Sequence, residues 1–175
     1  MDNFQFIYSD KADTIFSDVN DKISYSNKYE YLLRYLFITN MKLWDFEIKV
    51  RDKYYQIDER MHYKECIDKT NLLRNNIIEN IDNFIVKRFN LNKDAPLHTE
   101  SLGNVYDRLS ILKLRLQNIK LNNNYLDKQK QIDIEIQFNS LKKALDCFIN
   151  ELIEGKKNFV VNKQLKDYRK YEDNY

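Results

Sequence analysis

Glycine and proline are scarce in this chain of 175 residues, which contains two glycines and one proline. In average proteins these two residues together make up roughly 12% of the chain. Sandwiches, barrels and doubly wound sheets need many tight turns, and glycine and proline are favoured in such turns. The shortage therefore argues against sheet-based folds and favours long helices joined by few connections.

Cysteine is scarce as well, and Cys66 and Cys147 lie far apart in the sequence. Two cysteines without spaced partners do not form the framework of a disulfide-rich protein, and a reducing cytoplasm suits them. The sequence begins Met1-Asp2-Asn3-Phe4, with an acidic residue where a secretory signal carries basic ones. No run approaches 18 uncharged apolar residues. We therefore expect a cytoplasmic protein that does not insert into a membrane.

An excess of charge of one sign is also missing, because 29 Lys and Arg residues stand against 27 Asp and Glu, a net charge of +2. A nucleic-acid-binding protein usually carries a clear basic excess, so no nucleic-acid partner is expected. Hydrophobic residues make up 43% of the chain, which is enough for a folded core. We predict a single helical domain over residues 1–175, with its core at about 27–155 and a tail at 156–175.

Apolar residues recur at intervals of three and four along most of the chain, which is the period of helices with one buried face. The pattern predicts four long helices. Three of them lie at about 27–54, 58–89 and 101–122. The fourth carries an apolar stripe from Ile134 to Leu152 and ends at Gly155. A weaker helix is expected at 10–19, a loop at 90–99, and a further helix in the tail from Lys163 to Tyr171. Short connections favour an all-α, up-and-down antiparallel bundle of four long helices, with a short N-terminal helix and a C-terminal tail.

Four polar residues interrupt the apolar stripes of the first two long helices: Asn40, Glu47, Asn71 and Arg74. Burying a polar group without a partner costs about 1–3 kcal/mol, so such residues need a reason. One explanation is a polar network that fixes the register of the helices. The other is a ligand or metal site inside the bundle, in which Arg74 binds Glu47 or an anion.

A second group of polar residues lies at the predicted start of the third long helix, in the segment 99–110. Ser101 and Gly103 stand in or near its first turn, where free N–H groups can receive a phosphate, with Arg108 and Lys113 beyond. The alternative is an ordinary capped helix start, in which Arg108 pairs with an acidic residue of the preceding helix, Glu79 or Asp82.

Motifs for metal binding are incomplete. Glu59-x-x-His62 matches one element of a di-iron bundle, but that site needs a second such pair. The pairs Glu65-x-x-Asp68 and Glu79-x-x-Asp82 resemble the magnesium motifs of all-helical nucleotide pyrophosphatases, yet the companion Glu-x-x-Glu is missing. The sequence also lacks a Walker loop, a nucleophile elbow and a zinc spacing. We predict no metal ligands and name no cofactor.

Three segments of the sequence form a recognisable pattern: Leu43-Trp44-Asp45-Phe46-Glu47, the run from Ile67 to Arg74 with Ile81-Asp82, and Thr99-Glu100-Ser101 followed by the run from Asp107 to Leu112. In these segments the chain resembles a bacterial family, the domain of unknown function DUF4254. The resemblance covers about residues 29–168 and implies a helical fold without an established activity. It also implies that six residues belong to the family's recurring pattern: Glu47, Asn71, Arg74, Glu100, Asp107 and Arg108.

This chain departs from the DUF4254 pattern at two positions. The family commonly has a histidine after the motif tryptophan and an aspartate after the motif glutamate, whereas this chain has Asp45 and Ile48. The departures argue against a metal site that would use those two family residues.

Together these observations predict a protein that binds a small anionic ligand, such as a phosphorylated sugar or nucleotide, through a polar cluster between helices. In this hypothesis Arg74 and Arg108 bind negative charge, Asn40 and Asn71 orient the ligand, and Glu47 and Asp107 hold the arginines or act as acid and base. The full candidate site is Asn40, Glu47, Asn71, Arg74, Glu100, Ser101, Asp107 and Arg108.

Two other functions stay open from the sequence. The chain could instead be a helical interaction or scaffold protein, or a homo-oligomer, whose polar cluster only fixes register. It could also be a magnesium-dependent, pyrophosphatase-like enzyme with an acidic site made of Glu47, Asp68, Glu79 and Asp82.

Overall fold

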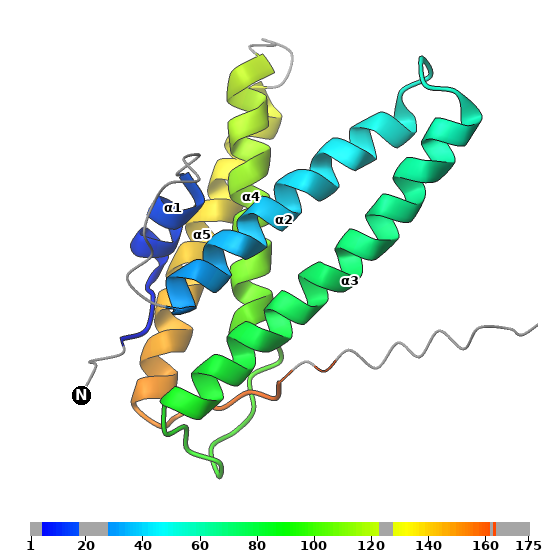
Figure 1. The fold of residues 1–175 in the computed structure, drawn as a ribbon. Helices are drawn as coiled ribbons and strands as arrows, with labels where there is room; N and C mark the ends of the chain where they lie inside the picture. Colours follow the sequence, from blue (N-terminus) through cyan, green and yellow to red (C-terminus); the bar gives the residue numbers. More distant parts are fainter. Residues whose placement is uncertain (1–4, 18–27, 123–127, 162, 164–175) are drawn as a thin grey trace, which may run out of the picture.

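The computed structural model describes residues 5–17, 28–122, 128–161 and 163, and this part of the chain is all-α (Figure 1). Its helices are α1 (Ser9–Ser17), α2 (Lys28–Arg51), α3 (Ile57–Arg88), α4 (Leu102–Asn122) and α5 (Lys128–Ile153). No strand occurs in these residues, where a single β-bridge joins Leu97 to Asn158. The predicted fold class and the four long helices are confirmed.

The helix ends follow local signals in the sequence. At the start of α3 the Glu59 carboxylate accepts a hydrogen bond of 2.9 Å from the N–H of the cap residue Gln56, two residues before the expected cap at Asp58. After α5, Gly155 has a φ of 67°, which favours glycine, and the N–H of Lys156 returns to the carbonyl of Glu151 at 2.8 Å. Gly155 therefore ends the last helix as predicted.

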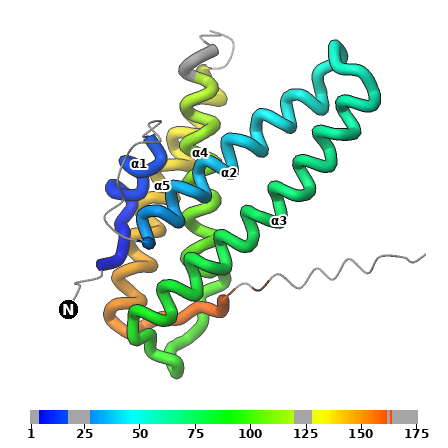
Figure 2. The backbone as a smooth tube through the Cα atoms, viewed as in Figure 1, coloured from blue at the N-terminus to red at the C-terminus, as the bar shows by residue number. Residues whose placement is uncertain are grey.

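The long helices form two antiparallel hairpins, α2–α3 and α4–α5 (Figure 2). The up-and-down arrangement is thus as expected, and α4 packs against α2, α3 and α5. The α2–α3 hairpin crosses α4 at an angle, so the end that joins α2 to α3 extends away from the other helices (Figures 1 and 2). We call this end, residues 43–73, the hairpin arm.

The core lies where the hairpins cross. The predicted stripes of α4 and α5 are buried there, including Leu109, Leu145 and Leu152. Burying such a side chain contributes about 1.5–3 kcal/mol. The largest fully buried side chains are Tyr29, Tyr106, Phe16, Phe37, Leu33, Leu36, Ile81, Ile85, Leu102, Leu109, Leu145 and Ile149.

None of the helices in the described ranges has a stretch long and apolar enough to cross a membrane.

The short helix α1 covers one side of the core and is tied to α5 and α4 by polar contacts. Asp146 of α5 accepts hydrogen bonds of 2.7 Å from both the N–H and the hydroxyl of Ser9, the first residue of α1. Farther along α1, Lys113 of α4 pairs with Asp13 at 2.5 Å, and Lys142 of α5 pairs with Asp10 at 2.7 Å. The predicted N-terminal helix is therefore a packed part of the domain; Val19, its expected last residue, lies outside the described residues.

The loop between α3 and α4 pairs with the start of the C-terminal tail. The N–H of His98 donates to the carbonyl of Asn158 at 2.7 Å, and the N–H of Asn158 donates to the carbonyl of Pro96 at 3.1 Å. The first residues of the tail thus lie against the rest of the domain. The helix predicted from Lys163 to Tyr171 falls outside the described residues, apart from Lys163.

Candidate functional site

A buried polar cluster joins α2 to α4 where the hairpin crosses α4. The Asn40 side chain donates to Oδ1 of Asp107 at 2.9 Å and to the Ser110 hydroxyl at 2.7 Å. The Ser110 hydroxyl in turn donates to the backbone carbonyl of Asp107 at 2.8 Å. All three side chains are buried. We call Asn40, Asp107 and Ser110 the Asn40 cluster.

Burial sets the protonation behaviour of Asp107. Loss of water raises the pKa of the Asp107 carboxyl above its ordinary value, because the charged form is the better hydrated one. The hydrogen bond from Asn40 and the positive charge of Arg74 both favour the ionised form and lower the pKa, without offsetting burial. Asp107 is therefore a buried acid whose pKa is raised by burial, an effect that its two neighbours reduce.

Arg74 of α3 lies beside this cluster with an unused hydrogen-bond donor. Its side chain is half-buried, and its Nε is enclosed without a hydrogen-bond partner. In the part of the chain that the structure describes, none of the ion pairs includes Arg74. A guanidinium group with an enclosed, unused donor is uncommon, because such groups normally bind carboxylates or phosphates.

Two further predicted residues lie on the hairpin. Asn71 is half-buried one turn before Arg74, so it shares that face of α3. Glu47 of α2 pairs with Arg51 at 2.8 Å, and that pair is exposed to solvent. The structure thus gives Glu47 a local partner on its own helix, and not Arg74.

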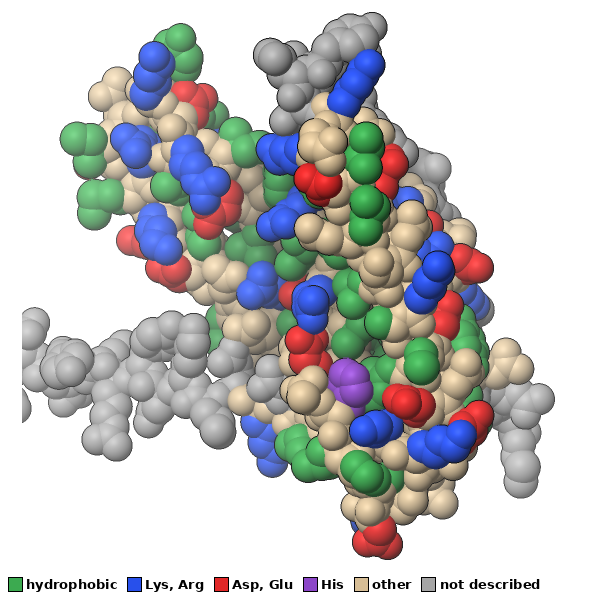
Figure 3. Space-filling model, turned by 180° about the vertical axis from the view of Figure 1, so that it is seen from behind, with side chains coloured by type: hydrophobic (Ala, Val, Ile, Leu, Met, Phe, Trp, Pro, Cys, Tyr) green, Lys and Arg blue, Asp and Glu red, His purple; other side chains and the backbone are tan. Residues whose placement is uncertain are grey.

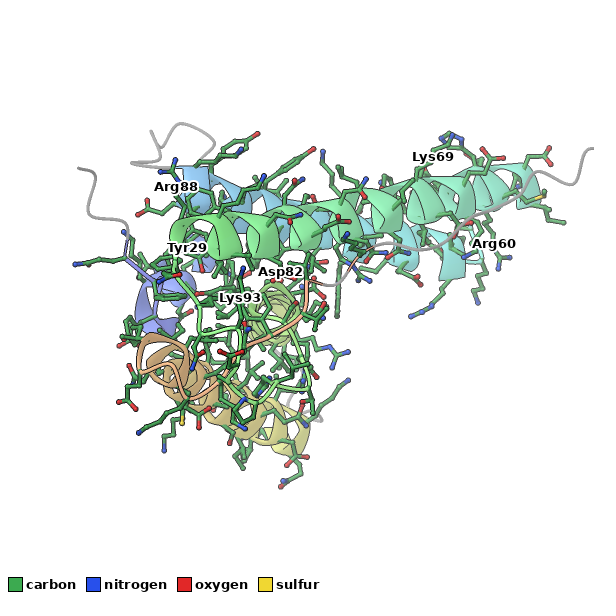
Figure 4. The ribbon with its side chains drawn as sticks, turned by 90° about the horizontal axis from the view of Figure 1, so that it is seen from below. Tyr29, Arg60, Lys69, Asp82, Arg88 and Lys93 are labelled. Carbon is green, nitrogen blue, oxygen red and sulfur yellow. The ribbon has the colours of Figure 1, made fainter. Side chains whose placement is uncertain are left out.

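At the start of α4, N–H groups that were expected to receive a phosphate already donate to side chains of the protein. Asp82 of α3, fully buried, accepts the N–H of Gly103 at 2.8 Å, and the Ser101 hydroxyl accepts the N–H of Asn104 at 3.3 Å. Figure 4 shows Asp82 between α3 and α4. An added Cβ on Gly103 would lie 2.8 Å from both Oδ1 of Asp82 and the carbonyl of Ile78, so only glycine fits here.

Arg108 and Glu100 form a separate surface pair near the start of α4. The Arg108 guanidinium donates to Oε1 of Glu100 at 2.7 Å. The structure gives this partner to Arg108, whereas the sequence suggested Glu79 or Asp82. Of the eight predicted residues, Asn40, Arg74 and Asp107 therefore come together beside Asn71, while Glu100, Ser101 and Arg108 gather at the start of α4.

The family model for the "Protein of unknown function (DUF4254)" family matches residues 30–161, which include both polar groups. The chain is a DUF4254 protein. Neither a curated protein nor a solved structure matches it. The description of this family names no reaction.

Two polar residues of the DUF4254 protein were not predicted as part of either group. Ser110 follows Asp107 by one turn of α4, and this spacing could have indicated it. Asp82 was considered as a partner of Arg108, a solvated helix charge or a magnesium ligand, and not as a cap, yet it is fully buried and accepts the N–H of Gly103. The signal for it is Gly103, since a glycine inside a helix often marks the close approach of another chain segment.

The proposed magnesium site does not form in the DUF4254 protein. Among the described residues, which include all four candidate ligands, no group of three or more His, Cys, Asp or Glu side chains could hold a metal ion. Asp82 caps α4, Asp68 pairs with Lys64 at 3.1 Å, and Glu47 pairs with Arg51. Three of the four acidic residues therefore have separate structural partners.

Proposed function

We propose that the DUF4254 protein binds a small anionic ligand, such as a phosphorylated sugar or nucleotide, where the α2–α3 hairpin crosses α4. The observation that carries this proposal is Arg74, whose enclosed Nε has no hydrogen-bond partner. A phosphate or carboxylate would accept two parallel hydrogen bonds from a guanidinium group and meet that need.

The surroundings of Arg74 give the other residues their parts in this proposal. Asn71, one turn away, is placed to orient the ligand. Both N–H groups of the Asn40 amide are already used by Asp107 and Ser110, so Asn40 acts by holding Asp107. Asp107 then holds Arg74 by charge. Lys and Arg side chains, together with acidic and apolar ones, border the notch between the hairpin arm and the rest of the molecule (Figure 3).

The test is thermal unfolding of the full chain with a panel of nucleotides, nucleotide sugars and sugar phosphates. A ligand at 100 times its dissociation constant adds about 2.7 kcal/mol, which is a shift of several degrees for a domain of this size. We expect such a shift in the wild type and its loss in Arg74→Ala. The matched control is Arg115→Ala, which removes an exposed arginine from α4 and should leave the shift unchanged.

The stability of Arg74→Ala without ligand distinguishes this proposal from a network that fixes register. Breaking a buried ion pair costs about 3–5 kcal/mol, but among the described residues Arg74 makes no direct ion pair and acts on Asp107 only through its charge at longer range. We therefore expect a variant that stays close to the wild type in its free energy of unfolding. A variant that loses several kcal/mol, together with no thermal shift for any ligand in the wild type, would contradict the proposal.

A second candidate function is self-association through the hairpin arm. At its end an open apolar hollow of about 310 Å³ is lined by Val50, Ile57, Arg60, Met61 and Lys64. Ile57 is 74% exposed and Met61 63% exposed. Apolar surface at the end of a projecting element is a common site of association. A second copy would bring the same apolar hollow to a two-fold interface, so each copy would cover the other.

A further inference from the structure

A histidine and a cysteine form a pair on the hairpin arm, away from the Asn40 cluster. His62 and Cys66 lie one turn apart on α3, and Nε2 of His62 is 3.6 Å from Sγ of Cys66. His62 is exposed and Cys66 half-buried. The sequence pattern paired His62 with Glu59 only, and Cys66 was considered only for disulfides. The pair serves neither the proposed ligand site nor the packing of α3 on α4.

The spacing of the two atoms fits a tetrahedral metal ion. Zinc binds cysteine sulfur at about 2.3 Å and histidine nitrogen at about 2.0–2.1 Å, and at a tetrahedral angle these bonds place sulfur and nitrogen about 3.6 Å apart. The observed separation is 3.6 Å. Because residues four apart share one face of a helix, α3 holds the two side chains in this arrangement without a rearrangement of the backbone.

We propose that His62 and Cys66 form a two-ligand site for a zinc-class ion. A thiolate and an imidazole favour such borderline-soft metals over magnesium or calcium, which prefer oxygen ligands. No third His, Cys, Asp or Glu of the described residues completes a metal-binding group, so water fills the remaining positions. On binding, the Cys66 thiol gives its proton to solvent as the sulfur–metal bond forms, and the lone pair of His62 Nε2 makes the second bond.

The test is titration of the full chain with Co²⁺, which binds such ligands in place of Zn²⁺ and gives a thiolate-to-cobalt absorption band. We expect a saturable band at one Co²⁺ per chain that added Zn²⁺ abolishes. His62→Ala and Cys66→Ser should each lose the band. The matched controls change the other histidine and the other cysteine, so His98→Gln and Cys147→Ser should keep it.

Three results would overturn the proposal. A band that persists in His62→Ala would show a thiolate acting without the histidine. A band lost in Cys147→Ser and kept in Cys66→Ser would place the metal on α5. Saturation at one Co²⁺ per two chains would show that a second copy of the chain, and not water, supplies the remaining ligands. Circular dichroism measures the helical content of each variant and so checks that it is folded. If Cys66→Ser does not fold, Cys66→Ala takes its place.

Discussion

Asp107 shows how the buried polar residues of this protein depend on one another. It accepts a hydrogen bond from Asn40, is influenced by the positive charge of Arg74, and is largely buried. Each neighbour favours the ionised carboxylate, while burial favours the neutral acid, and burial has the larger effect. The folded protein therefore holds the Asp107 proton more tightly than the unfolded chain does.

Asp107→Asn should change how stability depends on pH. Because the folded pKa of Asp107 is raised, its folded state keeps a proton that the unfolded chain has released once pH exceeds the ordinary value of about 3.9. Wild-type stability therefore falls as pH rises from there through the folded pKa, and the loss is complete above it. Asparagine does not titrate and still accepts the Asn40 hydrogen bond. The free energy of unfolding of the variant should therefore rise relative to that of the wild type across this pH range.

Urea unfolding of the wild type and Asp107→Asn at a series of pH values measures this difference. The two free energies should be closest at the acid end and separate as pH rises. Parallel curves, or a variant that falls further behind at higher pH, would contradict the assignment.

The misfit residues were partly predictable because helical period is a local property. Asn40 and Arg74 stand on stripes that are apolar elsewhere, and both lie at the junction of α2, α3 and α4. Glu47 stands on the same stripe as Asn40, yet it lies on the hairpin arm, where its side chain is exposed and pairs with Arg51. The place where the α2–α3 hairpin crosses α4 decides which of these polar residues are buried together. The period of apolar residues along one helix does not predict that place.

The helices α1 and α4 begin in the same way, with a carboxylate from another helix on the first turn. Asp146 of α5 binds the start of α1, and Asp82 of α3 binds the start of α4. The free N–H groups and the positive end of the helix dipole favour a negative charge there. Each carboxylate thus fixes the position of one helix relative to another.

Gly103→Ala should destabilise the protein although alanine favours helices. An added Cβ would lie 2.8 Å from Oδ1 of Asp82 and from the backbone carbonyl of Ile78. Overpacking costs about 1–3 kcal/mol and a lost cap about 0.5–2 kcal/mol, against a gain of about 1 kcal/mol in helix propensity. We expect a net loss of about 2 kcal/mol in the free energy of unfolding, measured in urea.

The neighbouring change Asn104→Ala is the control for this substitution. Asn104 is half-buried on the same turn of α4 and should cost about 0.5 kcal/mol or less. If Gly103→Ala were as stable as this control, the close contact between α3 and α4 would not restrict the residue at position 103.

The helices themselves were more predictable than what caps them. The predicted ranges 27–54, 58–89 and 101–122 agree within a few residues with α2, α3 and α4. Apolar period and residues such as Gly155 are read within a few positions of the chain. Asp82 and Asp146 act across 21 and 137 positions. Neither was predicted as a cap, because nothing near them in sequence identifies their partners.

The part of the molecule that the structure describes has a thick end, where its five helices pack, and a thin hairpin arm of two helices (Figure 1). The arm is held by contacts between its own helices, such as the stacking of Phe46 on Tyr63 with ring centres 6.2 Å apart. Two helices cannot cover all of each other's apolar side chains. This geometry leaves Ile57 and Met61 exposed at its end.

Replacing both Ile57 and Met61 by glutamate tests self-association through the arm. Exposed side chains contribute little to stability, so each substitution should change the free energy of unfolding by no more than about 0.5 kcal/mol. If a second copy covers the hollow, the wild type sediments as a dimer and the double variant as a monomer. Ile136→Glu, a change at a 59% exposed position on α5, should leave the dimer intact. A monomeric wild type at all concentrations would reject this function.

The projection of the arm could not be predicted from the sequence. The stripes of α2 and α3 continue along most of both helices, and they predict that the two helices pair without showing where α4 stops covering them. The crossing angle is set by how the ridges of one helix fit the grooves of another. The sequence thus predicted the number and order of the helices, and packing determined the shape.

The link between Ser9 and Asp146 also has a consequence during synthesis of the chain. Ribosomes add about 5–20 residues per second, so α1 emerges on the order of ten seconds before the carboxylate that caps it. During that interval α1, whose residue Phe16 is fully buried in the folded protein, lacks the helix α5 against which it packs. The nascent chain therefore carries this apolar segment uncovered until α5 has been made.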